Sequence, residues 1–234
     1  MVIDDKLNLL ANGELEVTGR LIDASNATLF ATLTHNEQSI SCIYKPIAGE
    51  RPLWDFPDGA LAHREYAAYL VSKACGFNCV PLTVLRDGPF GEGMVQEWID
   101  IDESIELVNF FSSDTPALRS MAIFDAVINN TDRKIGHLLP SVSGELYGCD
   151  HGVTFHTQDK LRTVLWQWSG DALTNAELEL LARSLHIFQN DLDLEPYLTS
   201  DEISALQLRV QRLISKAAMP IPNPDWPAVP WPAF

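Results

Sequence analysis

Segments in which apolar and polar residues alternate fill much of the first part of the chain and predict β-strands. Three of them follow one another closely, with polar turns between them, and this order favours sequential antiparallel pairing. A longer loop and one helical segment precede the last two. The predicted strands cover residues 15–21, 28–34, 39–44, 80–85 and 93–98.

Helical signals dominate the rest of the chain. Apolar residues recur at helical spacing in residues 61–74, and a Thr-Pro pair opens an apolar helix over residues 116–128. Two capping boxes, at Thr174 and Thr199, open the last two helices. The segment 220–234 has six prolines and two tryptophans, so we expect it to lie extended along the body. The pattern predicts an α+β fold with a small antiparallel β-lobe and a mainly helical lobe.

Composition narrows the class of protein. Hydrophobic residues make up 46% of the 234 positions, which is typical of a globular chain and argues against intrinsic disorder. The formal net charge of −16 argues against nucleic acid as a partner. The first residues have neither a basic nor an apolar region, and no long apolar run follows, so we expect a cytoplasmic protein without stable membrane association.

Lys45, at the end of the third predicted strand, and Glu65, in the next helix, are the first candidate site residues. Glu65 lies on a helix face of small and apolar residues, so we expect it in a packed surface. A strand lysine can hold phosphate oxygens of a nucleotide, and a glutamate on a facing helix can fix its ammonium group. A solvated surface lysine is the alternative interpretation.

A dense polar run, residues 129–137, follows the apolar helix that ends at residue 128. Phosphoryl transfer requires a carboxylate that orients or deprotonates the acceptor, together with ligands for a metal ion near the phosphates. Asp132 and His137 provide both residue types. The alternative is an ordinary helix C-terminus with Asn and Asp caps and a solvated Arg-Lys turn.

A third group, Asp150-His151-Gly152, follows an apolar strand-like segment. With Lys45, Glu65 and the Asp132 region it gives the order and rough spacing of a compact kinase, with a nucleotide site between two lobes. Two alternatives remain open. His151 and His156 could join the aspartates in a metallohydrolase centre, or the chain could be a nucleotide-binding pseudokinase that acts as a regulatory protein.

These motifs resemble segments of the phosphatidylinositol 3-/4-kinase-like group and are most similar to the type II phosphatidylinositol 4-kinases. An uncharacterised actinobacterial branch of that group is more similar still, over nearly the whole chain. The branch resemblance includes Arg-Pro-Leu-Trp-Asp-Phe-Pro at 51–57 and Leu-Arg-Thr-Val-Leu-Trp at 161–166. The segments that resemble the lipid kinases are residues 42–46, 49–52, 64–65, 81–83, 130–133 and 150–152.

The resemblance implies a protein-kinase-like two-lobe fold that binds ATP in the cleft. Residues 1–97 would form the nucleotide-binding lobe, and residues 98–234 the catalytic and metal-binding lobe. Lys45 would bind phosphates and Glu65 would pair with it. The nucleotide would also contact Ser25 and Asn26, in a turn that covers the phosphates, and the hinge residues Gln96, Glu97 and Trp98.

The same resemblance implies that Asp132 is the catalytic acid/base and that Asp150 is the main ligand of Mg²⁺ or Mn²⁺. His137 stands where the family usually has an asparagine as second metal ligand. Because imidazole is a softer donor than an amide oxygen, His137 suits a transition metal better than Mg²⁺. Mn²⁺ preference, weak turnover and adenylyl transfer therefore all stay open.

Lipid specificity does not extend to this chain, because it has no polybasic or palmitoylation cluster and its net charge is repelled by anionic membranes. We expect γ-phosphate transfer to a hydroxyl of an unidentified soluble small molecule or protein. Lys160 and Arg162 are candidates for holding an anionic acceptor, and a solvated loop is the alternative. The Pro/Trp-rich tail is a possible contact for a protein partner.

Overall fold

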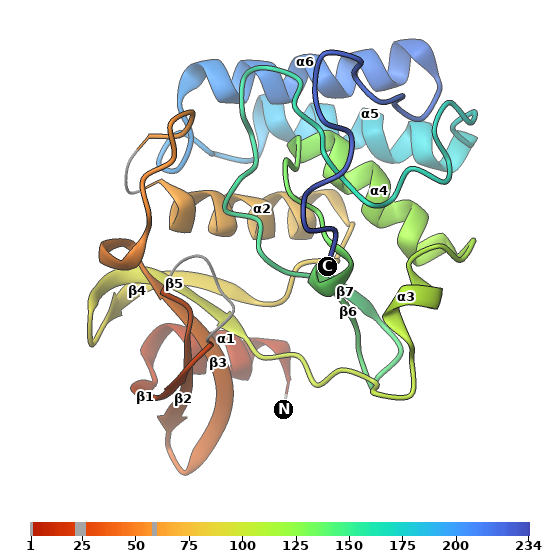
Figure 1. Ribbon diagram of the computed structural model, residues 1–234. Helices are drawn as coiled ribbons and strands as arrows, with labels where there is room; N and C mark the ends of the chain where they lie inside the picture. Colours follow the sequence, from red (N-terminus) through yellow and green to blue (C-terminus); the bar gives the residue numbers. More distant parts are fainter. Residues whose placement is uncertain (1, 22–26, 58–59) are drawn as a thin grey trace.

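A computed structural model describes all residues except 1, 22–26 and 58–59, so the predicted contacts of Ser25 and Asn26 lie outside the described residues. Figure 1 shows a sheet-containing lobe at one side and a group of helices at the other. The expected α+β fold, a small antiparallel β-lobe and a mainly helical lobe, is confirmed. No helix among the described residues has the length and apolar character needed to cross a bilayer.

The sheet has five antiparallel strands in the order β1-β2-β3-β5-β4, so the three consecutive strands pair as predicted. One face carries apolar residues that alternate along the strands and pack in one core with two leucines of α1. Helix α1 was not predicted, although half of its ten residues are apolar; only Leu9 and Leu10 of this helix are buried. The strands are β1 (Glu14–Arg20), β2 (Leu29–His35), β3 (Gln38–Pro46), β4 (Thr83–Gly88) and β5 (Gly91–Glu97), and α1 covers Ile3–Asn12.

Helix α2 (Leu61–Cys75) follows the loop after β3, which includes the short helix η1 (Ile47–Gly49). It is buried on more than one face and contacts both the sheet and the helical lobe. Its first two N–H groups are capped from outside the helix, because the Glu50 carboxylate accepts from Leu61 N (3.1 Å) and Ala62 N (2.8 Å). This cap fixes the N-terminal end of the helix that carries Glu65.

The helical lobe is built around α4 (Pro116–Ile128), which Thr115 caps and whose residues 121–128 are all buried. Both predicted capping boxes form, at Thr174 and Thr199, where α5 and α6 begin. Figure 1 shows these two helices side by side at the top, with the tail running down from α6 across the lobe. The other elements are α3 (Leu107–Phe110), η2 (Ile135–His137), β6 (Leu138–Pro140), β7 (Leu146–Gly148), α5 (Asn175–Asn190) and α6 (Ser200–Lys216).

Candidate functional site

Three charged side chains from distant parts of the chain meet between the lobes. Lys45 lies near the end of β3, and its Nζ is 2.6 Å from Glu65 Oε1 on α2 and 2.8 Å from Asp150 Oδ1 after β7. Burial by itself lowers the pKa of the Lys45 ammonium, but the Asp150 and Glu65 carboxylates outweigh it and raise this pKa. Lys45 therefore remains charged and is held by two carboxylates, as the sequence predicted for Glu65.

Glu65 is buried as expected, with 2% of its surface exposed. Its second oxygen, Oε2, accepts the backbone N–H of His151 at 2.8 Å, which joins α2 to the segment that carries Asp150. The neighbouring Arg64 is only 1% exposed and pairs with Glu202 of α6, because that helix covers this face of α2.

Asp150 has a left-handed backbone conformation, with φ of 61°, which is uncommon for a residue other than glycine and occurs often at functional sites. Its pKa is lowered, mainly by the Lys45 ammonium. Gly152 lies so close to α2 that a Cβ there would be 3.3 Å from Leu61 Cβ. The Asp-His-Gly segment is thus pressed against the helix that carries Glu65.

Asp132 lies in the loop after α4, whose C-cap residue Asn129 has a left-handed conformation. The polar run ends the helix, as the alternative interpretation expected, but its Arg-Lys turn is not solvated, because Arg133 is fully buried. Asp132 Oδ1 is 3.2 Å from Arg162 Nη2, and Oδ2 is 3.6 Å from Lys134 Nζ. Burial raises the pKa of Asp132, although the Lys134 and Arg162 charges oppose this shift.

Arg133 is the central residue of the loop that follows α4, and the sequence did not single it out. It is fully buried and forms a two-pronged ion pair with Asp125, at 2.9 Å (Nη2 to Oδ1) and 3.0 Å (Nε to Oδ2). Its Nη1 donates to the Cys149 carbonyl at 3.1 Å, and its Nη2 is 2.7 Å from His151 Nε2. Arg133 therefore fixes the chain on both sides of Asp150.

His137 places its Nε2 3.5 Å from Asp150 Oδ2, so the two predicted metal ligands lie on the same side of the cleft. Burial lowers the pKa of His137 to about 4, which leaves its imidazole neutral at neutral pH. A neutral imidazole nitrogen and a carboxylate oxygen are both suitable donors for a divalent ion. The described residues contain no cluster of three or more His, Cys, Asp or Glu side chains arranged around one such ion.

The two other histidines do not join this pair. His151 is fully buried, and its Nε2 is occupied by Arg133. His156 packs its ring against Phe56, with 5.5 Å between ring centroids, and accepts the Gln158 N–H through Nδ1. The structure therefore does not assemble the metallohydrolase centre that was the alternative interpretation.

The predicted hinge, residues 96–98, overlaps the end of β5, and several of its hydrogen-bonding groups are already bonded within the protein. Gln96 donates its side-chain amide to Thr83 Oγ1 at 2.9 Å, in the interior of the sheet lobe. The N–H groups of Glu97 and Trp98 donate to the carbonyls of Leu82 (2.8 Å) and Ser41 (3.1 Å). These two N–H groups are therefore not free to bind a nucleotide.

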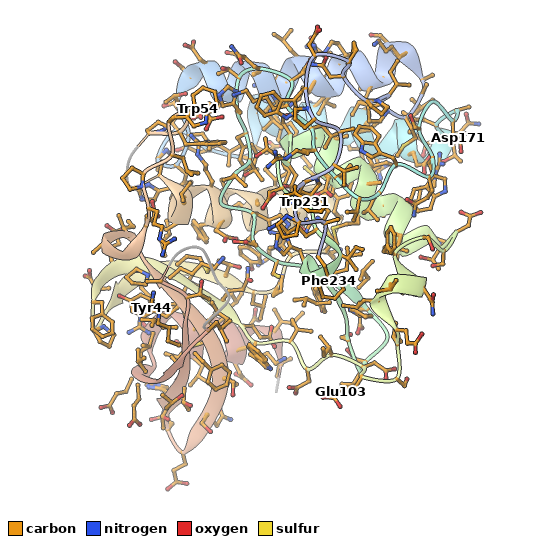
Figure 2. The ribbon with its side chains drawn as sticks, viewed as in Figure 1. Tyr44, Trp54, Glu103, Asp171, Trp231 and Phe234 are labelled. Carbon is orange, nitrogen blue, oxygen red and sulfur yellow. The ribbon has the colours of Figure 1, made fainter. Side chains whose placement is uncertain are left out.

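A cavity of about 360 Å³ connects the predicted catalytic residues. It extends from Lys45, Glu65 and Asp150 past Asp132 to the loop that contains Trp54, which Figure 2 labels beside one end of the helical lobe. The cavity-lining residues are Ala27, Lys45, Pro46, Glu50, Arg51, Leu53, Trp54, Asp55, Phe56, Leu61, Ala62, Glu65, Thr131, Asp132, Asp150, Gly152, Val153, Arg162 and Trp226.

The chain is similar in sequence to one known protein and in fold to a solved structure. Protein Rv2133c of Mycobacterium tuberculosis is 42% identical over 268 aligned positions, which cover 99% of this chain and 96% of that protein. A crystal structure of the Helicobacter pylori proinflammatory kinase CtkA matches over 89% of this chain and 94% of that one, with a TM-score of 0.47 and 12% identity. No family model matches the chain. The sequence relationship thus extends over nearly the whole chain.

Proposed function

This chain belongs to the family of the mycobacterial protein Rv2133c, and we propose that it is an ATP-dependent phosphotransferase of the phosphatidylinositol 3-/4-kinase-like group. It transfers the γ-phosphate of ATP to a hydroxyl group of a soluble small molecule or protein in the cytoplasm. Residues 1–97 form the nucleotide-binding lobe and residues 98–234 the catalytic lobe.

The observation that carries the proposal is the joint pairing of one lysine with two carboxylates from separate elements. Lys45 Nζ lies within 2.8 Å of both Glu65 and Asp150, and Glu65 is buried. A pair of charges buried only for stability gives little net gain, because desolvation offsets the attraction. The arrangement is well suited to phosphate binding, since Glu65 orients an ammonium group that faces the cavity.

Asp150 and His137 are the residues that would hold a divalent cation, Mg²⁺ or Mn²⁺. Their donor types fit, because burial keeps the imidazole neutral and Lys45 keeps the carboxylate ionised. When bound, the cation would neutralise charge on the phosphate oxygens. The imidazole favours Mn²⁺ in this position.

Asp132 orients the acceptor hydroxyl and takes up its proton. The acceptor oxygen forms a bond to the γ-phosphorus, the bond from that phosphorus to the β,γ-bridging oxygen breaks, and the products are a phosphate ester and ADP. The raised pKa of Asp132 suits this role, because a carboxylate of higher pKa is a better proton acceptor. Lys45 and Glu65 act on the phosphate side of the same cavity.

Calorimetric titration of ATP tests the nucleotide site, with Mg²⁺, with Mn²⁺ and without metal. We expect metal-dependent binding that weakens at least tenfold, about 1.4 kcal/mol, in Lys45→Ala. Lys73→Ala, an exposed lysine on α2, is the matched control and should bind like the wild type. Equal affinities of wild type and Lys45→Ala would contradict the assignment. If the single variant does not fold, the uncharged double variant Lys45→Met/Glu65→Gln replaces it.

Transfer of label from γ-labelled ATP, to water or to components of a cell lysate, tests the chemical step. Asp132→Asn should keep ATP binding and lose transfer by about a hundredfold or more, the size expected for a general base. Wild-type turnover in Asp132→Asn would refute the role of Asp132. Tight ATP binding by the wild type without any transfer would instead support the pseudokinase alternative.

A further inference from the structure

The cavity is also lined by residues that carry hydrogen-bond donors other than Lys45. Arg162 and Trp226 both line it, together with Trp54 and the catalytic Asp132. Arg162 comes from the segment after Asp150, and Trp226 from the tail. Since both donors line the same cavity as Asp132, they can contribute to the choice of the acceptor molecule that the site binds.

Arg162 has donor capacity left after its contacts within the protein. Its Nε donates to the Thr131 carbonyl at 2.7 Å, and its Nη2 lies 3.2 Å from Asp132 Oδ1. The other N–H groups of this guanidinium have no partner among the described residues, and 28% of the side chain is exposed. Arg162 can therefore hold the catalytic carboxylate and a second anionic group at once.

Trp226 presents a second unsatisfied donor. Its indole N–H is buried and has no hydrogen-bond partner in the described part of the chain. The ring is held in place by Lys160, whose Nζ lies 4.8 Å from the ring centroids of both Trp226 and Trp54 and 2.8 Å from Asp55 Oδ2. A buried polar N–H without a partner costs free energy, which a ligand acceptor atom would recover.

Lys160 itself does not serve as the predicted contact for the acceptor. It is 4% exposed, so its charge is enclosed by Asp55 and the two rings and does not face the cavity. Its position explains how the Pro/Trp-rich tail is kept against the body at this point. Hydrogen bonds from Thr163 N and the Trp166 indole to the Ala228 carbonyl, at 3.0 and 2.8 Å, hold the next part of the tail.

The other carboxylates in the cavity wall all have hydrogen-bond or ion-pair partners, although the whole protein is strongly acidic. Glu50 accepts the two N–H groups at the start of α2, Asp55 pairs with Lys160, and Glu65 and Asp150 share Lys45. Repulsion of an anion by these groups is therefore reduced near Arg162. An anionic group pairs with the spare N–H groups of Arg162 more strongly than a neutral group does, because both partners are then charged.

We propose that the acceptor is a small anionic alcohol, whose phosphate or carboxylate group binds Arg162 and the Trp226 indole N–H while its hydroxyl group faces Asp132. This inference rests on the proposed phosphotransferase function and names its substrate class. The tail then completes the acceptor site through Trp226. Docking of a separate protein by the tail, predicted from the sequence, would involve other residues, such as the exposed Trp231 and Phe234 labelled in Figure 2.

Indole resonances of the protein labelled with ¹⁵N-tryptophan test the proposal. The protein is first saturated with Mg²⁺ and a non-hydrolysable ATP analogue, so that the nucleotide occupies Lys45. Glycerol 3-phosphate, glycerate and uncharged glycerol are then added at equal ionic strength, and Trp226→Phe identifies the Trp226 signal. We expect one of the two anions to shift this signal in a saturable manner, and glycerol to leave it unchanged.

Arg162→Gln should weaken that titration at least tenfold, while Arg183→Gln, an exposed arginine on α5, should not. Trp226→Phe, which keeps a ring but removes the N–H, should weaken anion binding several-fold by calorimetry and serves if Arg162→Gln does not fold. Binding of the analogue without any anion-induced shift, or a shift that survives Arg162→Gln, would overturn the anionic acceptor alone. Failure of the analogue to bind would overturn the proposed function as well.

Discussion

Removal of the Arg133 guanidinium should destabilise the protein strongly. Asp125 and Arg133 are both fully buried, and they share hydrogen bonds of 2.9 and 3.0 Å. In Arg133→Met, Asp125 would keep only the Asn130 amide, at 3.0 Å, as a side-chain donor. An uncompensated buried charge costs about 3–5 kcal/mol, and the Cys149 carbonyl would also lose its 3.1 Å donor. We expect a loss of about 3 kcal/mol or more.

Urea unfolding at neutral pH measures this loss. Arg119→Met is the control, because Arg119 pairs with Glu177 near the surface and its removal should cost about 1 kcal/mol or less. The double variant Asp125→Leu/Arg133→Met should be more stable than Arg133→Met, since it leaves no unpaired charge. A cost below about 1 kcal/mol for Arg133→Met, or a double variant less stable than the single one, would refute the reasoning.

Two further predictions concern stability. Because burial lowers the pKa of His137 to about 4, the unfolded chain protonates first as the pH falls. The His137 contribution, complete above its ordinary pKa near 6.5, should fall by roughly 2–3 kcal/mol between about pH 7 and pH 4.5. In His137→Asn, urea unfolding should no longer show this loss of stability between about pH 7 and pH 4.5. The same pH profile of stability in His137→Asn and the wild type would contradict the prediction. Glu50→Ala should lower the free energy of unfolding by about 1–2 kcal/mol, because it removes the cap of α2, and Glu50→Gln should lower it less. If Glu50→Ala is as stable as the wild type, the cap does not stabilise the protein.

The parts of the fold that the sequence predicted are those with local causes. Apolar alternation gave three consecutive strands that pair as expected, and the boxes at Thr174 and Thr199 begin two helices. Strand β4 begins at Thr83 rather than at the predicted residue 80, because Pro81 lacks the N–H that a sheet requires. Helix α1 was not predicted although half of its residues are apolar, and its two buried leucines pack against the sheet.

The sequence likewise indicated some features of the candidate site and not others. Residue types and order along the chain indicated Lys45, Glu65, Asp132, His137 and Asp150. Four of these line one cavity, and His137 lies beside Asp150. Their roles in nucleotide binding and catalysis stay predictions until the titrations above are made.

The environment of charged side chains could not be read from the sequence. Arg64, Arg133 and Lys160 look like surface residues in their local segments, yet all three are buried by elements distant in the chain. Burial of an arginine or lysine requires a partner, and these partners are Glu202, Asp125 and Asp55. The pairs are separated by anything from a few residues to more than half the chain, so no periodic pattern marks them.

The sequence by itself therefore determined most element types, their order and the chemical groups available for the proposed phosphoryl transfer, because propensity, capping and side-chain chemistry are properties of short segments. Only the tertiary structure decided which charges meet, which are neutralised and which donors remain unpaired at Arg162 and Trp226. The reason is physical: the free energy of a charge depends on the partners and the solvent that surround it, and long-range packing sets both.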